Sequence, residues 1–429
     1  MGRLNFVVAL VLISISFVSA QERNESFMKD GIAPPPDGSP KVTLQTTLGK
    51  ANSGRSGYAG LAFSPDGRTL ATGDEVKPAK LWDVATGQLR HTLSKHKDSI
   101  RVVFSPDSRT LATTGDKTVT LWDIETGALK STLTGSTGLV LGFTYWVTFS
   151  PDGRLLLTSG SDGKARLYEA ATGLLKATLA CRRGLMFAAF SPDGMMIGTA
   201  CNQDATPRLW NAQTGQLRAT LSGHSAGVTR LIFSPDGQTI ATESLDDTVN
   251  LWDAETGSLK ATLAGHNNTI YQTKFSPDGR FLATASGDGT AMLWDVARGR
   301  LKHTLSGFDG VVTRVAFSPD GQILAASGGY KSRQAKLWDT ATGKLKATFT
   351  GHRKDIETVI VSPGGQLLVT ASEDSARLWN TATGELVANL DGARYPAIFS
   401  PDGRRLATAG PKDNVLLWEI TTETAGLRK

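Results

Sequence analysis

Short apolar runs alternate with polar turns over residues 228–263, and most of the chain after residue 40 repeats this stretch. Its four runs end at Phe233, Thr242, Trp252 and Leu263. They are rich in Val, Ile, Thr and Leu, and a turn follows about every ten residues, a pattern typical of β-strands. We therefore predict that each repeat is a four-stranded antiparallel meander.

The turn after the first run is Ser-Pro-Asp-Gly, in which Pro presets φ and Gly supplies a positive φ. Its proline recurs nine times, at intervals of 38 to 45 residues: Pro65, Pro106, Pro151, Pro192, Pro235, Pro277, Pro319, Pro363 and Pro401. The aromatic residue of the third run also recurs nine times: Trp82, Trp122, Tyr168, Trp210, Trp252, Trp294, Trp338, Trp379 and Trp418. Self-similarity at this period indicates stacked units that cannot bury their faces alone.

Two short motifs mark a known family. Leu-Trp-Asp stands at residues 81–83, 121–123, 251–253, 293–295 and 337–339, and Gly-His at 223–224, 265–266 and 351–352. In these motifs the chain resembles the WD-repeat (WD40-type) β-propeller family, over about residues 41–420. The resemblance implies an all-β fold, a single closed β-propeller whose blades are four-stranded sheets.

The blade number follows from the fourth run. A Leu-x-x-[Thr/Asn]-[Leu/Phe] pattern ends units one to eight, whereas unit nine ends near Thr422 without it. The missing pattern occurs at Leu44 to Leu48, before the first unit. We therefore predict nine blades, with an N-terminal strand that completes the last blade and removes two sheet edges. Eight blades with one displaced unit is the alternative.

The resemblance also implies a hydrogen-bonded network that braces each blade through the Gly-His histidine, a second-strand Ser or Thr, a turn Asp and the Trp. Two units carry the full set: His224, Ser244, Asp246 and Trp252, and His266, Ser286, Asp288 and Trp294. Two more come close: His96, Thr114, Asp116 and Trp122, and His352, Ser372, Asp374 and Trp379.

The two cysteines fall in unit four. Cys181 stands where other units have Gly-His, and Cys201 aligns with Ser286. The family geometry implies that both lie on one face of the blade. We predict a disulfide that replaces the missing His/Ser contact, since an exported chain can keep one. A pair of free, part-buried thiols is the alternative.

The N-terminus has the pattern of a signal peptide. Arg3 precedes an apolar segment over residues 4–18, and small residues up to Ala20 supply a cleavage site. We predict cleavage near Ala20 and a secreted or periplasmic protein with no membrane span after cleavage. An uncleaved anchor is the alternative, although about 15 apolar residues are fewer than a span needs. Residues 21–40 are expected to be a flexible lead-in and residues 421–429 a C-terminal tail.

Charge changes this picture little. The formal net charge is +6 in 429 residues, and basic residues are spread over the repeats, so we expect no nucleic-acid partner. One basic position recurs in the fourth run: Arg90, Lys130, Lys176, Arg218, Lys260, Lys302 and Lys346. Protection of an edge strand against intermolecular pairing explains it best. A belt that binds polyanions or glycans is the alternative.

One segment matches a catalytic motif. Residues 223–227 read Gly-His-Ser-Ala-Gly, the G-x-S-x-G pattern of a nucleophile elbow, which requires a strand-to-helix turn. Here the segment lies between two β-runs, and its counterparts at 265–267 and 351–353 lack the serine. We expect no catalysis, no cofactor and no metal. A hydrolase-like or lactonase-like propeller enzyme with a site at the channel mouth is the alternative.

Candidate partner contacts lie on the first strands and on two loops. The position three before the final Phe of the first run reads Arg101, Trp146, Phe187, Arg230, Gln272 and Arg314 in units two to seven. Arg and aromatic side chains are frequent interface anchors, but this position could equally serve contacts between blades. Longer loops add Leu141 and Phe143 in unit three and Tyr330 in unit seven. We therefore predict a monomeric, exported, non-catalytic scaffold that binds a protein partner.

Overall fold

The structure, a computed structural model, describes residues 40–49, 60–73, 78–94, 101–115, 118–133, 144–160, 162–181, 184, 186–411 and 414–422. The described residues form strands and turns and contain no α-helix. The predicted signal peptide and nearly all of the lead-in lie outside them. The chain divides into two compact units.

The first unit contains described residues 103–307 and holds five sheets, which we call blades two to six. Blades two and three are β6 (Arg101–Phe104), β7 (Thr110–Gly115), β8 (Thr118–Asp123), β9 (Leu129–Leu133), β10 (Thr144–Phe149), β11 (Leu155–Gly160), β12 (Lys164–Glu169) and β13 (Leu175–Ala180). Blades four to six are β14 (Met186–Phe190), β15 (Met196–Cys201), β16 (Asp204–Asn211), β17 (Leu217–Thr220), β18 (Val228–Phe233), β19 (Thr239–Ser244), β20 (Val249–Asp253), β21 (Leu259–Leu263), β22 (Ile270–Phe275), β23 (Phe281–Ser286), β24 (Ala291–Asp295) and β25 (Arg300–Leu305).

The second unit contains the described residues before 103 and after 307 and holds blades one, seven, eight and nine. Blades one and seven are β2 (Leu61–Phe63), β3 (Thr69–Thr72), β4 (Ala79–Asp83), β5 (Leu89–Leu93), β26 (Val312–Phe317), β27 (Ile323–Gly328), β28 (Ala335–Asp339) and β29 (Leu345–Phe349). Blades eight and nine are β30 (Ile356–Val361), β31 (Leu367–Ser372), β32 (Ala376–Asn380), β33 (Leu386–Leu390), β34 (Arg394–Phe399), β35 (Arg405–Ala409), β36 (Val415–Thr422) and β1 (Pro40–Leu48).

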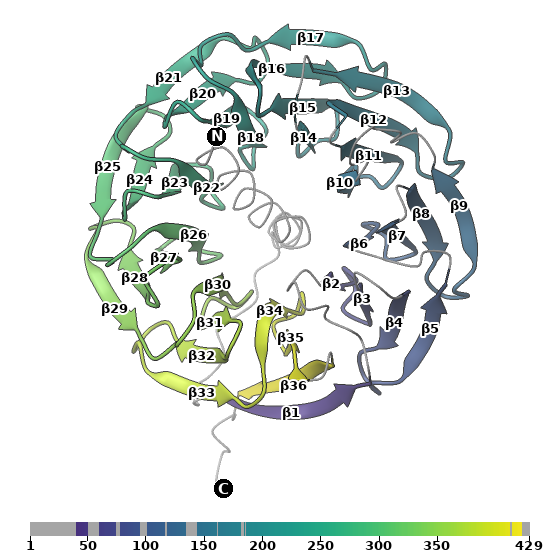
Figure 1. Cartoon of the computed structure of the whole chain (residues 1–429), viewed down its shortest axis with the longest axis vertical. Helices are drawn as coiled ribbons and strands as arrows, with labels where there is room; N and C mark the ends of the chain where they lie inside the picture. Colours follow the sequence, from purple (N-terminus) through teal and green to yellow (C-terminus); the bar gives the residue numbers. More distant parts are fainter. Residues whose placement is uncertain are drawn as a thin grey trace, which may run out of the picture. The chain divides into compact units, whose positions relative to one another are not determined.

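Every blade is a four-stranded antiparallel sheet, and eight blades take their strands in chain order (Figure 1). The described residues thus contain nine blades, which confirms the predicted number and not the alternative of eight. The regular Pro-Asp-Gly and Thr-Gly turns fix the meander because each turn reverses the chain after one short strand.

The ninth blade takes its fourth strand from the N-terminal segment, as predicted. Strand β1 pairs antiparallel with β36, with Leu44 opposite Trp418 and Leu48 opposite Val415. In Figure 1 the purple β1 runs beside the yellow β36. Gln45 links this strand to its neighbours because its amide donates to the Ala85 carbonyl at 3.0 Å and accepts from Arg405 Nε at 3.0 Å.

Both faces of the central strands are buried because blades stack on one another. All six residues of β19 are buried, whereas the fourth strand β21 is exposed at its first two residues. Leu209 and Leu221 of blade four form one core with Ile240 and Trp252 of blade five. Blade-to-blade burial of apolar area therefore stabilises the first unit.

A glycine allows blade six to approach blade five closely. In blade six, Gly299 has φ 59° and sits over the fourth strand of blade five. A Cβ atom built on Gly299 would lie 2.4 Å from the Cβ of Ala261. Both the positive φ and this contact require glycine.

Candidate functional site

In each blade the loop before the first strand meets the hairpin between the second and third strands. In blade five these segments are residues 222–227 and 245–248. We call the edge that carries them the hairpin edge. This edge holds the predicted brace, both cysteines and the hairpin of Tyr330, so it is the candidate functional surface.

In blade five a chain of hydrogen bonds crosses this edge. Trp252 Nε1 donates to Thr242 Oγ1 at 2.8 Å, and the same oxygen lies 2.7 Å from His224 Nε2. On the other side of the ring, His224 Nδ1 lies 2.9 Å from Asp246 Oδ2. Ser225 N also donates to this carboxylate, at 2.9 Å. The network therefore ties the loop, the hairpin and the third strand together.

Blade six repeats the network and shows which histidine nitrogen carries the proton. His266 Nδ1 lies 2.7 Å from Asp288 Oδ2, Nε2 lies 2.7 Å from Thr284 Oγ1, and Trp294 Nε1 donates to Thr284 at 3.0 Å. The ionised carboxylate only accepts hydrogen bonds, so Nδ1 must donate. In the neutral ring Nε2 then accepts from the threonine, whose oxygen accepts from the tryptophan.

The second-strand hydroxyl of this network is a threonine, which corrects the sequence-based assignment to Ser244 and Ser286. Ser244 Oγ instead donates to the main-chain oxygens of Ala226 and Gly227, at 3.1 Å each. Ser286 Oγ donates to the main-chain carbonyl oxygen of Asn268 at 2.9 Å. The serines lie on the same face as the threonines but two residues closer to the hairpin, beyond the reach of the indole.

The same threonine position recurs in most blades. Seven tryptophans donate from Nε1 to it, at 2.8 to 3.0 Å, and their acceptors are Thr72, Thr113, Thr199, Thr242, Thr284, Thr370 and Thr408. In blade two the acceptor is therefore Thr113 and not the predicted Thr114. His96 and Asp116 of that blade lie outside the described residues.

The brace shifts the pKa values of Asp288 in blade six and of His352 in blade eight. Burial raises the pKa of Asp288, but hydrogen bonds from His266 and Thr290 outweigh it and bring the pKa down to about 2. In blade eight, burial and the nearby Arg377 lower the pKa of His352 to about 4, partly offset by Asp374. Near neutral pH, Asp288 is therefore ionised and His352 is neutral.

Cys181 and Cys201 are joined by a disulfide in blade four, with Sγ atoms 1.92 Å apart and Cα atoms 6.5 Å apart. Cys201 is the last residue of β15, and Cys181 follows β13 of blade three. The bond therefore connects the loop before blade four to its hairpin, the two segments that histidine and aspartate connect in blade five.

Blades three and four use an arginine where blade five uses histidine, a feature that the sequence reasoning missed. Arg166 Nη2 lies 2.6 Å from Asp162 Oδ2, and Arg208 Nη1 lies 2.9 Å from Asp204 Oδ2. Each arginine stands two residues before the blade's aromatic residue, on the third strand. An arginine four residues after the turn Asp was the available signal.

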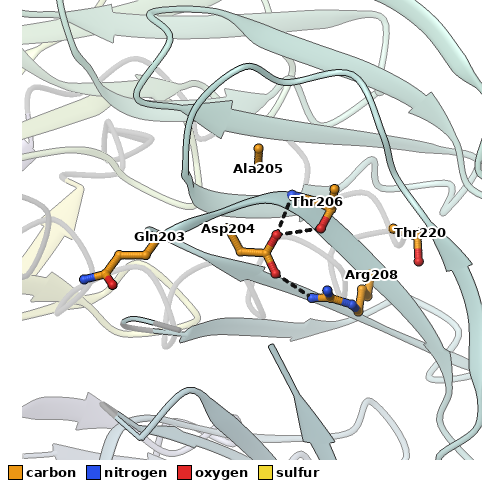
Figure 2. A pocket seen from close by; sticks show the side chains of 6 residues that line it. All are labelled: Gln203, Asp204, Ala205, Thr206, Arg208 and Thr220. Carbon is orange, nitrogen blue, oxygen red and sulfur yellow. Dashed lines mark hydrogen bonds and ion pairs between the residues drawn. The ribbon is translucent and has the colours of Figure 1, made fainter. Parts of the chain in front are cut away.

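A pocket of about 460 Å³ opens beside the pair in blade four (Figure 2). Its lining residues are Gln203, Asp204, Ala205, Thr206, Arg208 and Thr220. Figure 2 shows Asp204 between Thr206 and Arg208, with hydrogen bonds to both. The sequence reasoning did not identify this pocket, since it depends on the hairpin and the fourth strand together.

In the first unit the predicted partner contacts on the first strands are buried against neighbouring blades. Trp146 and Phe187 have ring centroids 5.2 Å apart, and the Arg230 guanidinium lies 5.5 Å from the Phe187 ring centre. Arg230 is 3% exposed and stands opposite the equally buried Glu243 in the β18–β19 ladder. These contacts join blades three, four and five, as the inter-blade alternative expects.

Two of the remaining first-strand candidates, Arg101 and Arg314, lie in the second unit. Arg314 is buried, and its Nε donates to the main-chain carbonyl oxygen of Glu357 in blade eight at 3.1 Å. Burial raises the pKa of Glu357, although Arg314 opposes this. Burial lowers the pKa of the partly buried Arg101 to about 10, while Tyr395 opposes the shift. Gln272, in the first unit, is buried as well.

The hairpin of blade seven departs from the repeat and exposes an aromatic ring. Tyr330 is 61% exposed, and Lys331 Nζ lies 5.4 Å from its ring centre. Lys331 has φ 70°, an uncommon conformation for a non-glycine residue that is often found at functional positions. Gly310 lies close to this hairpin. A Cβ atom built on Gly310 would lie 2.2 Å from the main-chain carbonyl oxygen of Tyr330. The other two loop candidates, Leu141 and Phe143, lie outside the described residues.

The basic position of the fourth strands forms contacts within its own blade. Lys260 Nζ lies 3.3 Å from Asp253 Oδ2, and Arg90 Nη2 lies 3.3 Å from Asp83 Oδ2. Lys130 Nζ donates to Thr110 Oγ1 at 3.0 Å. These local partners favour a structural role at the edge strand over a polyanion belt.

The geometry gives Ser225 no nucleophile elbow. It lies in the connection from β17 to β18, so a strand and not a helix follows it. Across the described residues, no three His, Cys, Asp or Glu side chains are grouped to hold a metal. Among the same residues, no helix has the length and apolarity of a membrane span.

Nine four-stranded blades, with a Trp–Thr–His–Asp brace in blades five and six, define a β-propeller protein of the WD-repeat class. Six segments match the family described as WD domain, G-beta repeat: residues 87–123, 127–169, 215–253, 257–295, 299–339 and 343–380. They cover more than half of the chain, and the chain therefore belongs to the WD40 family. Residues 170–214, which contain the disulfide and every pocket residue except Thr220, lie between two matches.

Solved structures show the same fold. The crystal structure of the computationally designed Ika8 protein matches with a TM-score of 0.59 and 23% identity, covering 74% of this chain and 95% of that chain. At this identity the likeness concerns the fold alone. No curated protein is significantly similar to this chain.

Proposed function

We propose that this protein is an exported, non-catalytic WD40 scaffold that binds a protein partner at its hairpin edge. WD40 propellers generally serve as protein-interaction scaffolds. The observation that carries the proposal is the hairpin of blade seven, where Tyr330 is 61% exposed beside Lys331 at positive φ. Tyrosine is enriched at interfaces because it offers a large apolar ring with a polar end.

Two features support export. The N-terminal sequence has the charge, apolar segment and small residues of a signal peptide ending near Ala20. The disulfide between Cys181 and Cys201 fits an oxidising compartment, since disulfides are rare in reducing ones. Mass spectrometry of the secreted or periplasmic chain should give an N-terminus near Gln21. An intact N-terminus on the exported chain would contradict cleavage.

A non-catalytic role is supported by where the perturbed groups lie. Asp288 and His352 have shifted pKa values, but each is hydrogen-bonded within the brace of its blade. Such shifts also occur in structural networks and need no reaction to explain them. Sedimentation of the mature chain should give a monomer.

The test of the partner surface uses two exposed apolar residues on different edges. Tyr330→Ser alters the hairpin edge, whereas Met195→Ser alters a residue that is 66% exposed in the turn between the first and second strands. Capture from the exported fraction, with each variant as bait, should lose the partner only for Tyr330→Ser. Equal capture by Tyr330→Ser and the unaltered chain would move the partner site elsewhere.

A further inference from the structure

The pocket of blade four is a second, independent candidate for binding. It lies where the β15–β16 hairpin meets β17, and its volume of about 460 Å³ is within the usual range of small-ligand sites. Along β16, Asp204, Thr206 and Arg208 alternate in the strand, so their side chains share one face. Thr220 of β17 stands opposite Arg208 in the ladder and adds a hydroxyl to that face.

The pocket is polar but carries no net charge. Asp204 and Arg208 form an ion pair at 2.9 Å, with side chains 7% and 16% exposed. Thr206 N and Oγ1 also donate to Asp204 Oδ1, at 3.1 and 2.6 Å. Breaking a buried pair is costly because it leaves one charge uncompensated. A ligand of either charge would be attracted by one member of the pair and repelled by the other, whereas a neutral one can use the pair as it stands.

Several hydrogen-bonding groups remain for a ligand. The ion pair uses Nη1 of Arg208, a lining residue of the pocket, and its guanidinium has further N–H groups. Thr220 and Gln203 are exposed and contribute a hydroxyl and an amide, each of which can donate and accept. The lining residues therefore supply both donors and acceptors.

The walls are held from two sides. The disulfide ends β15 at Cys201, directly before the hairpin. On the other side, Gly227 in the loop before β18 lies close to the hairpin. A Cβ atom built on Gly227 would lie 1.9 Å from the main-chain carbonyl oxygen of Asn202. A site built on restrained elements loses little entropy when a ligand binds.

We propose that this pocket binds a neutral sugar ring. Sugar hydroxyls both donate and accept hydrogen bonds, which matches the mixed groups on the wall, and they bring no charge that would compete for Asp204 or Arg208. The pocket lies in blade four and the proposed partner hairpin in blade seven, so this inference does not depend on the proposed function.

The experiment is isothermal titration of the full mature chain with glucose, galactose and N-acetylglucosamine, each in parallel with glucuronate and inorganic phosphate. At least one neutral sugar should bind saturably, with the same Kd at low and high salt, because no charge is screened. Thr220→Val should weaken binding roughly tenfold, the effect of about one lost hydrogen bond.

The matched control is Thr178→Val in blade three. Thr178 stands opposite Arg166 just as Thr220 stands opposite Arg208, so it tests the same change away from the pocket. Should Thr220→Val reduce stability, Gln203→Ala at the exposed hairpin provides the second variant, again with weaker binding expected. Absence of binding by all three sugars would overturn the proposal. So would preferential, salt-sensitive binding of glucuronate or phosphate, or equal effects of Thr220→Val and Thr178→Val.

Discussion

Replacement of Thr284 by valine should destabilise blade six strongly, although the two side chains have nearly the same volume. The hydroxyl of Thr284 accepts from Trp294 Nε1 at 3.0 Å and lies 2.7 Å from His266 Nε2. Valine cannot replace either bond. The indole N–H and the imidazole nitrogen would then stay buried without this partner.

The magnitude follows from the two lost bonds and the burial of their partners. A net contribution near 1 kcal/mol for each bond, together with the desolvation cost of an unsatisfied donor, gives a loss of about 2–4 kcal/mol in the free energy of unfolding. Thr273 in β22 of the same blade provides a matched control, since it is 0% exposed and its hydroxyl has no hydrogen-bond partner in the structure. Thr273→Val should therefore leave stability unchanged or increase it.

Urea unfolding followed by far-UV circular dichroism measures both variants, and equal slopes would show that the same surface is exposed. Thr284→Ser, which restores the hydroxyl, should recover most of the loss. The reasoning would be refuted if Thr284→Val and Thr273→Val had the same free energy of unfolding. In that case the hydrogen bonds of the brace would not contribute to the free energy of unfolding.

Three further predictions concern other blades. The pKa of His352 is 6.5 in the unfolded chain and about 4 in the folded one. Protonation therefore favours the unfolded state as the pH falls, and the free energy of unfolding should decline by about 3 kcal/mol between pH 6.5 and about pH 4. His352→Asn should lack this component in urea titrations across the same pH range, and an unchanged pH dependence would contradict the assigned burial. Reduction of the bond between Cys181 and Cys201, 20 residues apart, should cost about 3 kcal/mol through the entropy of the unfolded chain. The same urea midpoint with and without dithiothreitol would count against it. Gly299→Ala combines a positive φ with overlap on Ala261 and should cost about 2–4 kcal/mol, part of which Ala261→Gly should recover in the double variant; strictly additive effects would argue against the contact.

The repeats could be predicted from the sequence because their strands are set by local chemistry. A proline at each turn, followed in most copies by an aspartate and a glycine, defines where a strand stops, and the order of the copies then gives the number of blades. The N-terminal strand was predictable for the same reason, since Leu44 and Leu48 fit a pattern that the ninth unit lacks.

The site was less accessible to sequence reasoning because side-chain alternation does not distinguish two residues on one face. Thr242 and Ser244 lie on the same side of β19, and only the distance to Trp252 decides which hydroxyl the indole reaches. For Arg230, the neighbouring blade determines burial, and a contact between segments far apart in the chain leaves no local pattern. The arginine braces depend similarly on how a hairpin folds back.

The pairing of β1 with β36 brings the two ends of the folded region together. Pro40 stands opposite Thr422 in the same ladder, so the two ends of the folded region are neighbours. A short linker could therefore join them, and new termini could be opened in an exposed turn such as the one at Gly237 without loss of any strand pair. The fold therefore does not require that blade one come first in the chain, and a circularly permuted chain should form the same nine sheets.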